Sequence, residues 1–269
     1  MTNRYRKEDH TFAICAYGES RYLEQCIDSL LKQSVKSRVV LFTSTPNEHI
    51  NELAKKYELP LKVNSNAKGI AADWNFAYEQ TATKLVTLAH QDDIYYPDFL
   101  EQSLKQINSC AKPMIAFTGY YEIQDGKTVT DKDFINLRIK RILLSPLAIN
   151  RSQKTKWFRR RLISLGNPIC CPSVTYVKDN LSKKLFDEGL ETNLDWAAWE
   201  KLSKREGQFA YIPKPLMAHR IYADSATGEL IHNGIRSKED LKVLEKFWPA
   251  PIARALNRLY SKSQKSRLK

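Results

Sequence analysis

The segment that decides the fold is "LVTLAHQDDIYYPD", residues 85–98. It starts with a short apolar run, Leu85 to Ala89, whose length and residue types are those of a buried strand. After this run come His90 and Gln91 and then two adjacent carboxylates, Asp92 and Asp93. Pro97 then opens a helix-like pattern. Two adjacent like charges at the tip of a strand indicate either a solvated turn or part of a cation site.

Strand-like and helix-like segments alternate on the N-terminal side of this stretch. The order predicts an α/β protein with a Rossmann-like, mainly parallel sheet flanked by helices. Ligands in such sheets bind at the carboxyl ends of the strands, where the acidic pair lies. The expected strands are 11–16, 39–42, 61–63 and 85–89, and the expected helices are 22–31, 45–57, 70–80 and one from 97. The helix 45–57 is expected to start at a capping box, Thr45-Pro46-Asn47-Glu48.

The second half is less regular and ends in helices. Because no repeat or low-complexity linker interrupts the chain, we expect one domain over 1–227 and a basic, helical C-terminal extension over 228–269. The expected strands are 114–123, 128–130, 173–177, 209–212 and 216–221, and the expected helices are 193–205, 238–247 and 251–260.

Composition limits the compartment and the partners. The 269 residues include 43 Lys and Arg against 30 Asp and Glu, a formal charge of +13, which favours polyanionic or anionic-surface partners.

The five cysteines are odd in number and form no C-x-x-C pair, so neither a zinc site nor a disulfide framework is indicated. The first ten residues lack an apolar run, and no stretch approaches the roughly 20 apolar residues of a spanning helix. We therefore expect a cytoplasmic protein that meets a membrane only peripherally.

The basic segments between about 134 and 165 have two interpretations. A run of charge is most simply a solvated face. Alternatively, the apolar residues Leu143, Leu144, Leu147 and Ile149, with Trp157 and Phe158 beside further arginines, are typical of an interfacial helix on an anionic membrane. Nucleic acid is not expected as the partner, because no zinc-finger, RNP, KH or basic-zipper signature is present.

Four segments, in order, resemble family 2 glycosyltransferases of the GT-A fold. The first three are "TFAICAYGESRYLEQCIDSLLKQ", "GIAADWNFAYEQTATKLVTLAHQDDIYYPDFL" and "LETNLDWAAWEKLSKREGQFAYIPKPLMAHR". The fourth runs from "HRIYADSAT" through "FWPAPIARALNRLYSKSQKS" and resembles a bacterial subgroup associated with surface polysaccharides. The resemblance implies a nucleotide-diphospho-sugar donor, a saccharide or lipid-linked acceptor and Mn²⁺ or Mg²⁺. It also implies a nucleotide-sugar half over about 1–125 and an acceptor half over about 126–227.

The resemblance assigns roles to particular residues. Asp93, the last carboxylate of the Asp-X-Asp-like element Gln91-Asp92-Asp93, is the implied metal ligand, and Asp195 in "LDWAAW" is the implied catalytic base. A base opposite the leaving phosphate is the arrangement that inversion requires. The implied donor contacts are Ala16, Tyr17, Glu19, Thr43, Asp73, Asn75, Asp92 and Arg220, and His219 is a candidate for the diphosphate or the metal.

Several positions depart from the family pattern or have simpler interpretations. Thr43-Ser44-Thr45 stands where the family has acids that read the base, and Tyr222 replaces a histidine. Asp195 is also what a helix N-terminus favours, and His219 is also a plausible core residue in an apolar strand. Two other function classes remain open from the residues alone: a metal-dependent nucleotidyltransferase on a similar sheet, and a non-enzymatic basic protein that binds nucleic acid or membrane.

Overall fold

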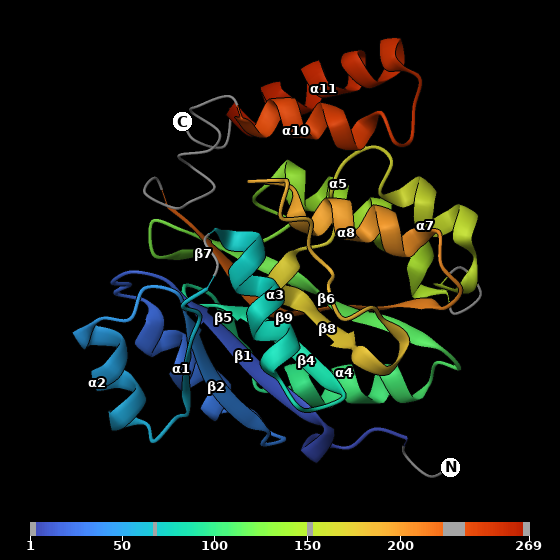
Figure 1. Cartoon of the computed structure of the whole chain (residues 1–269). Coiled ribbons are helices and arrows are strands. Elements are labelled where there is room, and N and C mark those ends of the chain that lie inside the picture. The colour runs from blue at the N-terminus through green and yellow to red at the C-terminus, as the bar shows by residue number, and fades with distance from the viewer. Residues whose placement is uncertain (1–3, 67–68, 150–152, 223–234, 266–269) are drawn as a thin grey trace.

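The computed structural model describes residues 4–66, 69–149, 153–222 and 235–265. It contains a nine-stranded mixed sheet with helices on both faces (Figure 1). In sheet order the strands are β3 (Leu61–Val63), β2 (Arg38–Thr43), β1 (His10–Ala16), β4 (Leu85–His90), β8 (Val174–Val177), β6 (Pro113–Gln124), β9 (Gln208–Ile221) and β5 (Ile94–Tyr95), and β7 (Lys127–Val129) pairs with the end of β6. The first four are parallel, and β8 is antiparallel to both of its neighbours. The predicted α/β fold is confirmed.

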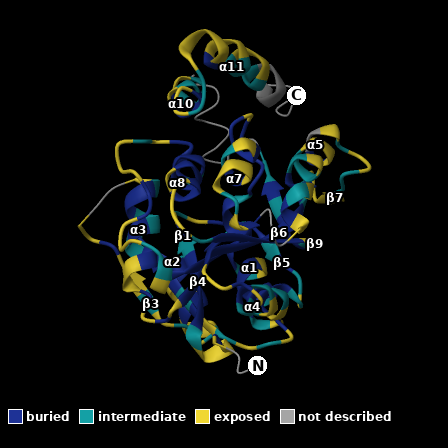
Figure 2. Cartoon of the chain, turned by 90° about the vertical axis from the view of Figure 1, so that its right-hand side faces the viewer, coloured by how far each residue is buried: buried dark blue, intermediate teal, exposed yellow. Residues whose placement is uncertain are grey.

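The two faces of the sheet have separate cores. Along β1, Phe12 and Ile14 pack on one side and Ala13 on the other, as the alternation of a strand requires. The first side is covered by α1 (Leu23–Leu31), α2 (Glu48–Lys56) and α4 (Phe99–Asn108), and the second by α3 (Ile70–Gln80), α7 (Lys156–Leu162) and α8 (Leu194–Ser203). The strands are buried throughout the centre of the molecule (Figure 2).

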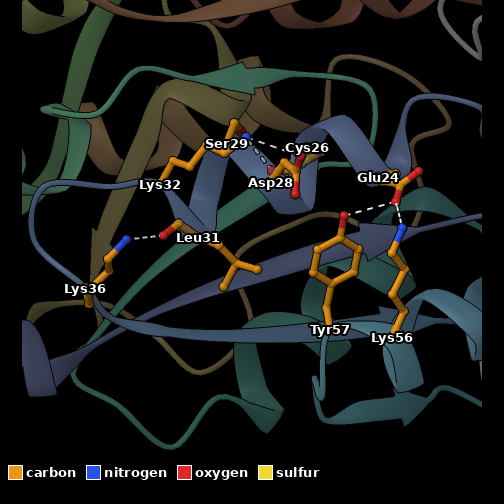
Figure 3. Close-up of polar contacts among 9 residues, drawn as sticks. All are labelled: Glu24, Cys26, Asp28, Ser29, Leu31, Lys32, Lys36, Lys56 and Tyr57. Carbon is orange, nitrogen blue, oxygen red and sulfur yellow. Dashed lines mark hydrogen bonds and ion pairs between the residues drawn. The ribbon is translucent and has the colours of Figure 1, made fainter.

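The helix α2 begins later than the sequence pattern predicts. Its N-cap is Asn47, whose Oδ1 accepts a hydrogen bond of 2.9 Å from the amide of Ile50. Thr45, the expected cap, instead accepts a 2.7 Å hydrogen bond from the amide of Gly18 in the loop after β1. At the other end of the helix, Lys56 and Tyr57 both contact the Glu24 carboxylate of α1 (Figure 3). The pair of helices is thus tied together beside the loop after β1.

A single strand, β9, replaces the two short strands expected at 209–212 and 216–221. It pairs with β6 over nearly its whole length, and the register shifts around Gly119. A Cβ at Gly119 would lie 2.6 Å from the carbonyl oxygen of Pro213, so only glycine fits at this irregularity. The far end of β9 pairs with β5, a short strand that the sequence pattern does not predict. This pairing brings His219 and Arg220 next to the acidic pair.

Three further helices occupy one end of the molecule, away from α2 and the N-terminus (Figures 1 and 2). They are α5 (Ile135–Leu144), α10 (Ile235–Leu244) and α11 (Ala250–Lys265). Within the described ranges, none of the helices combines the length and apolar character needed to cross a bilayer.

Candidate active site

A cavity of about 1140 Å³ lies at the carboxyl ends of the parallel strands. Its walls come from the loops after β1 and β4, the start of α3, the segment before α8, and the end of β9. Most of the residues predicted for the site line it, namely Ala16, Tyr17, Glu19, Thr43, Asp73, Asp92, Asp195, His219 and Arg220. Two predicted residues, Asp93 and Asn75, are not among the lining residues.

Gln91 joins two loops of the cavity wall. Its side-chain amide accepts a 3.0 Å hydrogen bond from the amide of Tyr17 and donates one of 2.9 Å to the carbonyl of the same residue. A carboxylate could accept the first bond but could not donate the second. The glutamine therefore fixes the loop after β1 to the acidic loop after β4.

Asp73 brings a carboxylate to the end of β2. Although Asp73 belongs to α3, it accepts hydrogen bonds from Ser44 Oγ (2.7 Å) and from Asn64 Nδ2 (2.9 Å). Ser44 directly follows Thr43 at the end of β2, in the Thr43-Ser44-Thr45 segment that replaces the acids of the family pattern. The carboxylate of Asp73, from α3, therefore lies at the end of β2, where the chain itself has no acid.

Asn75 has a structural position. It is buried, its Nδ2 donates to the carbonyl of Phe186 (2.9 Å) and to Glu188 (3.1 Å), and its Oδ1 accepts from the amides of Leu185 and Phe186. All its hydrogen-bonding capacity is directed at the 185–188 segment. The expected donor contact of Asn75 is thus not supported, because helical geometry turns this side chain away from the cavity while Asp73 faces it.

Asp93 is the centre of a buried polar cluster. Its side chain is fully buried, and Oδ1 accepts a 3.0 Å hydrogen bond from Nδ1 of His219 and one of 2.9 Å from the amide of Arg220. Burial opposes protonation of His219, but the charges of Asp93 and Asp92 and the hydrogen bond outweigh it and raise the His219 pKa. The other oxygen, Oδ2, is buried without a hydrogen-bond partner among the described residues.

Asp92 is the member of the acidic pair that lines the cavity. Burial, followed by the charge of Asp93, raises the pKa of Asp92, while His219 and a hydrogen bond with the Tyr222 hydroxyl oppose the shift. A carboxylate with a raised pKa beside a second carboxylate gains stability from a bound cation.

Arg220 of β9 contacts the loop after β4 that carries Asp92. Nε donates to the carbonyl of Asp92 and one terminal nitrogen donates to Gln25 Oε1, both at 2.9 Å, and the guanidinium carbon lies 4.0 Å from the ring centroid of Tyr22. The guanidinium is thus held in one orientation at the edge of the cavity.

Asp195 also lines the cavity and lies in the first turn of α8. Its Oδ1 accepts a 2.8 Å hydrogen bond from the amide of Trp196, and its Oδ2 accepts one of 2.6 Å from Nδ2 of Asn167. Burial raises the pKa of Asp195, and the two hydrogen bonds and the charge of Arg236 oppose the shift. A buried carboxylate with a raised pKa at a cavity wall suits a general base.

The C-terminal helices hold the chain that leads into α8. Glu239 of α10 accepts hydrogen bonds from the amide of Glu191 and from the amide and hydroxyl of Thr192, at 2.8–3.0 Å. Asp240 accepts one of 2.8 Å from Asn193, which has a left-handed backbone (φ 53°) at the N-cap of α8. Helix α10 therefore packs directly against the segment that leads to Asp195.

Some lining residues were not found by sequence reasoning. Arg236 and Lys140 face the cavity from α10 and α5, and the ring of Trp74 stacks on that of His90 with centroids 4.9 Å apart. Burial lowers the pKa of His90 to about 4, so this ring is neutral at pH 7. The "DWN" triplet in 73–75 carried a signal for Trp74, because an aromatic residue stands beside two polar candidates. No local signal marks Arg236 or Lys140, since each lies among other basic residues.

Comparison with known proteins agrees with this geometry. The pattern of glycosyl transferase family 2 matches residues 11–172. An uncharacterized glycosyltransferase of Methanocaldococcus jannaschii is 24% identical over 217 residues, which cover 77% of this chain and 69% of the relative. This chain therefore belongs to glycosyl transferase family 2.

Two solved structures are similar in fold. TarS of S. aureus in complex with UDP-GlcNAc superposes with a TM-score of 0.58 at 15% identity, covering 92% of this chain and 70% of TarS. Mannosyltransferase PcManGT from Pyrobaculum calidifontis, in complex with GDP-Man and Mn²⁺, gives 0.63 at 15% identity and covers 96% and 72%. The fold is GT-A, and the protein is a glycosyltransferase. The two rival classes, a nucleotidyltransferase and a non-enzymatic basic protein, are set aside by the family assignment.

Proposed function

We propose that this glycosyltransferase moves a sugar from a nucleotide-diphospho-sugar to a hydroxyl group of a saccharide or lipid-linked acceptor, with inversion at the anomeric carbon. One observation carries the proposal. A single cavity is lined by a carboxylate at the tip of β4, Asp92, and by a second, buried carboxylate at the start of α8, Asp195. Inverting transfer needs a charge-neutralised leaving group on one face of the sugar and a base on the other.

The donor side of the cavity would be the wall built from β1, β2 and α3. Ala16 ends β1, Tyr17 and Glu19 follow that strand, and Thr43 ends β2. Asp73 and the hydroxyl of Ser44 provide polar groups for the base, and Asn64 orients that carboxylate. The two hydrogen bonds between Gln91 and Tyr17 hold this wall against the loop after β4, which would meet the diphosphate.

The acceptor side would be the wall that carries Asp195. In the transfer step, an acceptor hydroxyl gives its proton to Asp195 while its oxygen forms a bond to the anomeric carbon. The bond from that carbon to the diphosphate breaks, and the nucleoside diphosphate leaves with the bonding electron pair. A positioned base of this kind contributes about 10²–10⁴-fold to the rate. Arg220 is held in one orientation by Asp92 and Gln25 and would contact phosphate oxygens.

A divalent cation, Mn²⁺ or Mg²⁺, fits the acidic loop. Within the described ranges no group of three His, Cys, Asp or Glu side chains forms a closed metal site, which suits an ion that takes its other ligands from phosphate and water. Asp92 lines the cavity and would be the ligand. Asp93, the ligand expected from the sequence, has a buried oxygen without a partner and would act from behind with His219. When bound by Asp92, such a cation would supply positive charge to neutralise the leaving diphosphate.

The relatives support the donor class. TarS was solved with UDP-GlcNAc and PcManGT with GDP-Man and Mn²⁺, so a nucleotide-diphospho-sugar and a divalent ion are the ligands to test first. The setting in surface polysaccharide assembly rests on the C-terminal sequence resemblance. We further propose donor and acceptor halves meeting near residue 125, and a cytoplasmic enzyme that contacts the inner face of the membrane.

A thermal-shift panel of UDP-, GDP- and dTDP-sugars, each with and without Mn²⁺ or Mg²⁺, tests the proposal. One nucleotide sugar should raise the melting temperature, and the ion should increase the effect. Transfer from that donor to sugar alcohols or saccharides, with the product anomer read by NMR, then tests inversion. Failure of every nucleotide sugar to stabilise the protein, with or without ions, would refute the assignment.

A further inference from the structure

The exposed large apolar residues of the described chain are concentrated in two stretches. Only Tyr17 and Val63 lie elsewhere. The others belong to α5, α7, their flanking loops and α11, and they are Ile135, Ile139, Ile142, Ile149, Trp157, Phe158, Leu165, Ile252 and Leu259. Scattered single apolar residues need no explanation, but a concentration of this kind marks an interaction surface.

The isoleucines of α5 form one stripe. Ile135, Ile139 and Ile142 are spaced at i, i+4 and i+7 and are 71%, 48% and 62% exposed. Leu137 and Leu144, on the opposite side of the helix, are buried. The helix is therefore apolar on both faces, and only one of them packs on the protein.

The outer helix α11 has a second stripe. Ile252 and Leu259, seven residues apart, are 47% and 66% exposed, whereas Ala253 between them is buried. Arg254 and Arg258 are exposed on the same helix. In α5 the exposed Arg138 stands beside the isoleucine stripe, whereas helical spacing puts Arg254 and Arg258 on a different exposed side of α11 from Ile252 and Leu259.

The charge of these helices has one sign. Together α5, α7 and α11 contain eleven Lys and Arg residues and no Asp or Glu. Arg159 is buried and Arg160 pairs with Glu200, but Arg138, Arg161, Arg254 and Arg258 remain exposed. Arg141 of α5 and Lys156 of α7 are also paired, with Asp131 and Glu206. Apolar stripes on helices whose own charged residues are all basic are complementary to a bilayer with an apolar interior and an anionic headgroup region.

The surface borders the cavity. Both views place α5, α7 and α11 at the same end of the molecule, opposite α2 and the N-terminus (Figures 1 and 2). Ile139 and Leu143 of α5 and Tyr260 of α11 also line the cavity. The two stripes therefore belong to helices that form the cavity rim on the side of Asp195.

We propose that α5, α7 and α11 form a docking surface for an anionic bilayer, named here the basic apolar rim and defined by Ile135, Ile142, Ile252, Leu259 and the exposed arginines Arg138, Arg161, Arg254 and Arg258. The isoleucine and leucine side chains enter the headgroup region, and the arginines meet lipid phosphates. If the proposed function holds, the acceptor wall faces the bilayer, and a lipid-linked acceptor reaches Asp195 without leaving the membrane.

Vesicle co-sedimentation of the full chain tests the rim. Vesicles of phosphatidylcholine with about 30% phosphatidylglycerol should sediment the protein, pure phosphatidylcholine should not, and about 0.5 M salt should weaken binding. The double variants Ile135→Ser/Ile142→Ser and Ile252→Ser/Leu259→Ser should each lower the partition coefficient about tenfold. The triple variant Arg138→Gln/Arg254→Gln/Arg258→Gln should lose most of the binding.

Matched controls come from the other end of the molecule. Val63→Ser removes an exposed apolar residue, and Lys7→Gln/Lys36→Gln/Lys55→Gln removes the same charge as the arginine variant from exposed positions. Both should bind anionic vesicles as the unchanged protein does. Equal losses in the control and rim variants would overturn the proposal, because binding would then follow net charge alone.

Other occupants of the rim give different results. A dimer in light scattering that the isoleucine variant dissociates, without vesicle binding, would show that a second copy covers the stripe. Binding of duplex DNA without vesicle binding would show a nucleic-acid surface; either result overturns membrane docking. Nucleotide-sugar stabilisation, measured in parallel, separates the two proposals: vesicle binding without it would refute the proposed donor and leave the rim standing.

Discussion

The side-chain amide of Asn167 donates a 2.6 Å hydrogen bond to Oδ2 of Asp195 and joins the loop after α7 to the first turn of α8. The bond favours the charged form of the carboxylate, whereas burial favours the neutral form and has the larger effect. Asn167 thus limits how far the pKa of Asp195 rises.

The pH dependence of transfer follows from this pair. A base must be deprotonated to act, so activity should fall as pH drops through the pKa of Asp195, which lies above the ordinary aspartate range. Asn167→Ala removes a donor to the carboxylate and should move the acid limb of the profile to higher pH. Rates of sugar transfer measured over a pH series check the direction.

A variant of an exposed asparagine on α2, Asn51→Ala, is the matched control and should leave the profile unchanged. An Asn167→Ala profile identical to that of the unchanged protein would mean that Asp195 is not the group that titrates during transfer.

Substitution of the proposed base should separate binding from chemistry. Asp195→Asn keeps the size and two polar atoms of the side chain but cannot accept a proton, so transfer should fall about 10²–10⁴-fold. Donor affinity, measured by titration calorimetry, should be unchanged, because Asp195 lies on the acceptor wall. Full transfer activity in this variant would refute its role.

The two adjacent carboxylates should behave differently. Asp92→Asn removes the charge that lines the cavity and should abolish the increase in donor stabilisation that Mn²⁺ gives. Asp93→Ala leaves His219 and the amide of Arg220 without their acceptor, so the free energy of unfolding should drop by about 2 kcal/mol in urea titrations.

If Asp93 rather than Asp92 is the metal ligand, the two variants should respond to Mn²⁺ in the opposite way. If Asp93→Asn abolishes the metal response and Asp92→Asn preserves it, Asp93 is the ligand, as the sequence predicts, and its partnerless oxygen is the group that reaches the ion.

The attachment of α10 should matter for stability. Glu239→Ala removes the acceptor of three hydrogen bonds and should lower the free energy of unfolding by about 3 kcal/mol. The exposed Glu245, which directly follows α10, is the control, and Glu245→Ala should change stability by less than about 0.5 kcal/mol. Similar values for both variants would show that α10 is only loosely joined to the domain.

The sequence predicted the N-terminal half of the fold closely, because its signals are local. The helix expected at 70–80 is α3, Ile70–Gln80, and the strand expected at 85–89 is β4, Leu85–His90. Short or irregular strands were harder. The two residues of β5 are too few to show a period, and the continuity of β9 through Pro213 depends on its pairing with β6 rather than on its own sequence.

The candidate site was predictable where its residues follow strands, as Tyr17 and Asp92 do. The orientation of side chains was not predictable, because it depends on partners far along the chain. Asp93 turns inward to meet His219, 126 residues later, and Asn75 turns toward Phe186, 111 residues later. Arg236 reaches the cavity only because α10 packs against the segment before α8.

That packing also sets an order of assembly on the ribosome. The four parallel strands pair with one another in the order β3, β2, β1 and β4, and all four have been synthesised by residue 90. The turn that presents Asp195 is held by Glu239 and Asp240, which are synthesised more than 40 residues after it. A nascent chain can therefore fold its first strands early, but it gains a finished acceptor wall only when α10 leaves the exit tunnel.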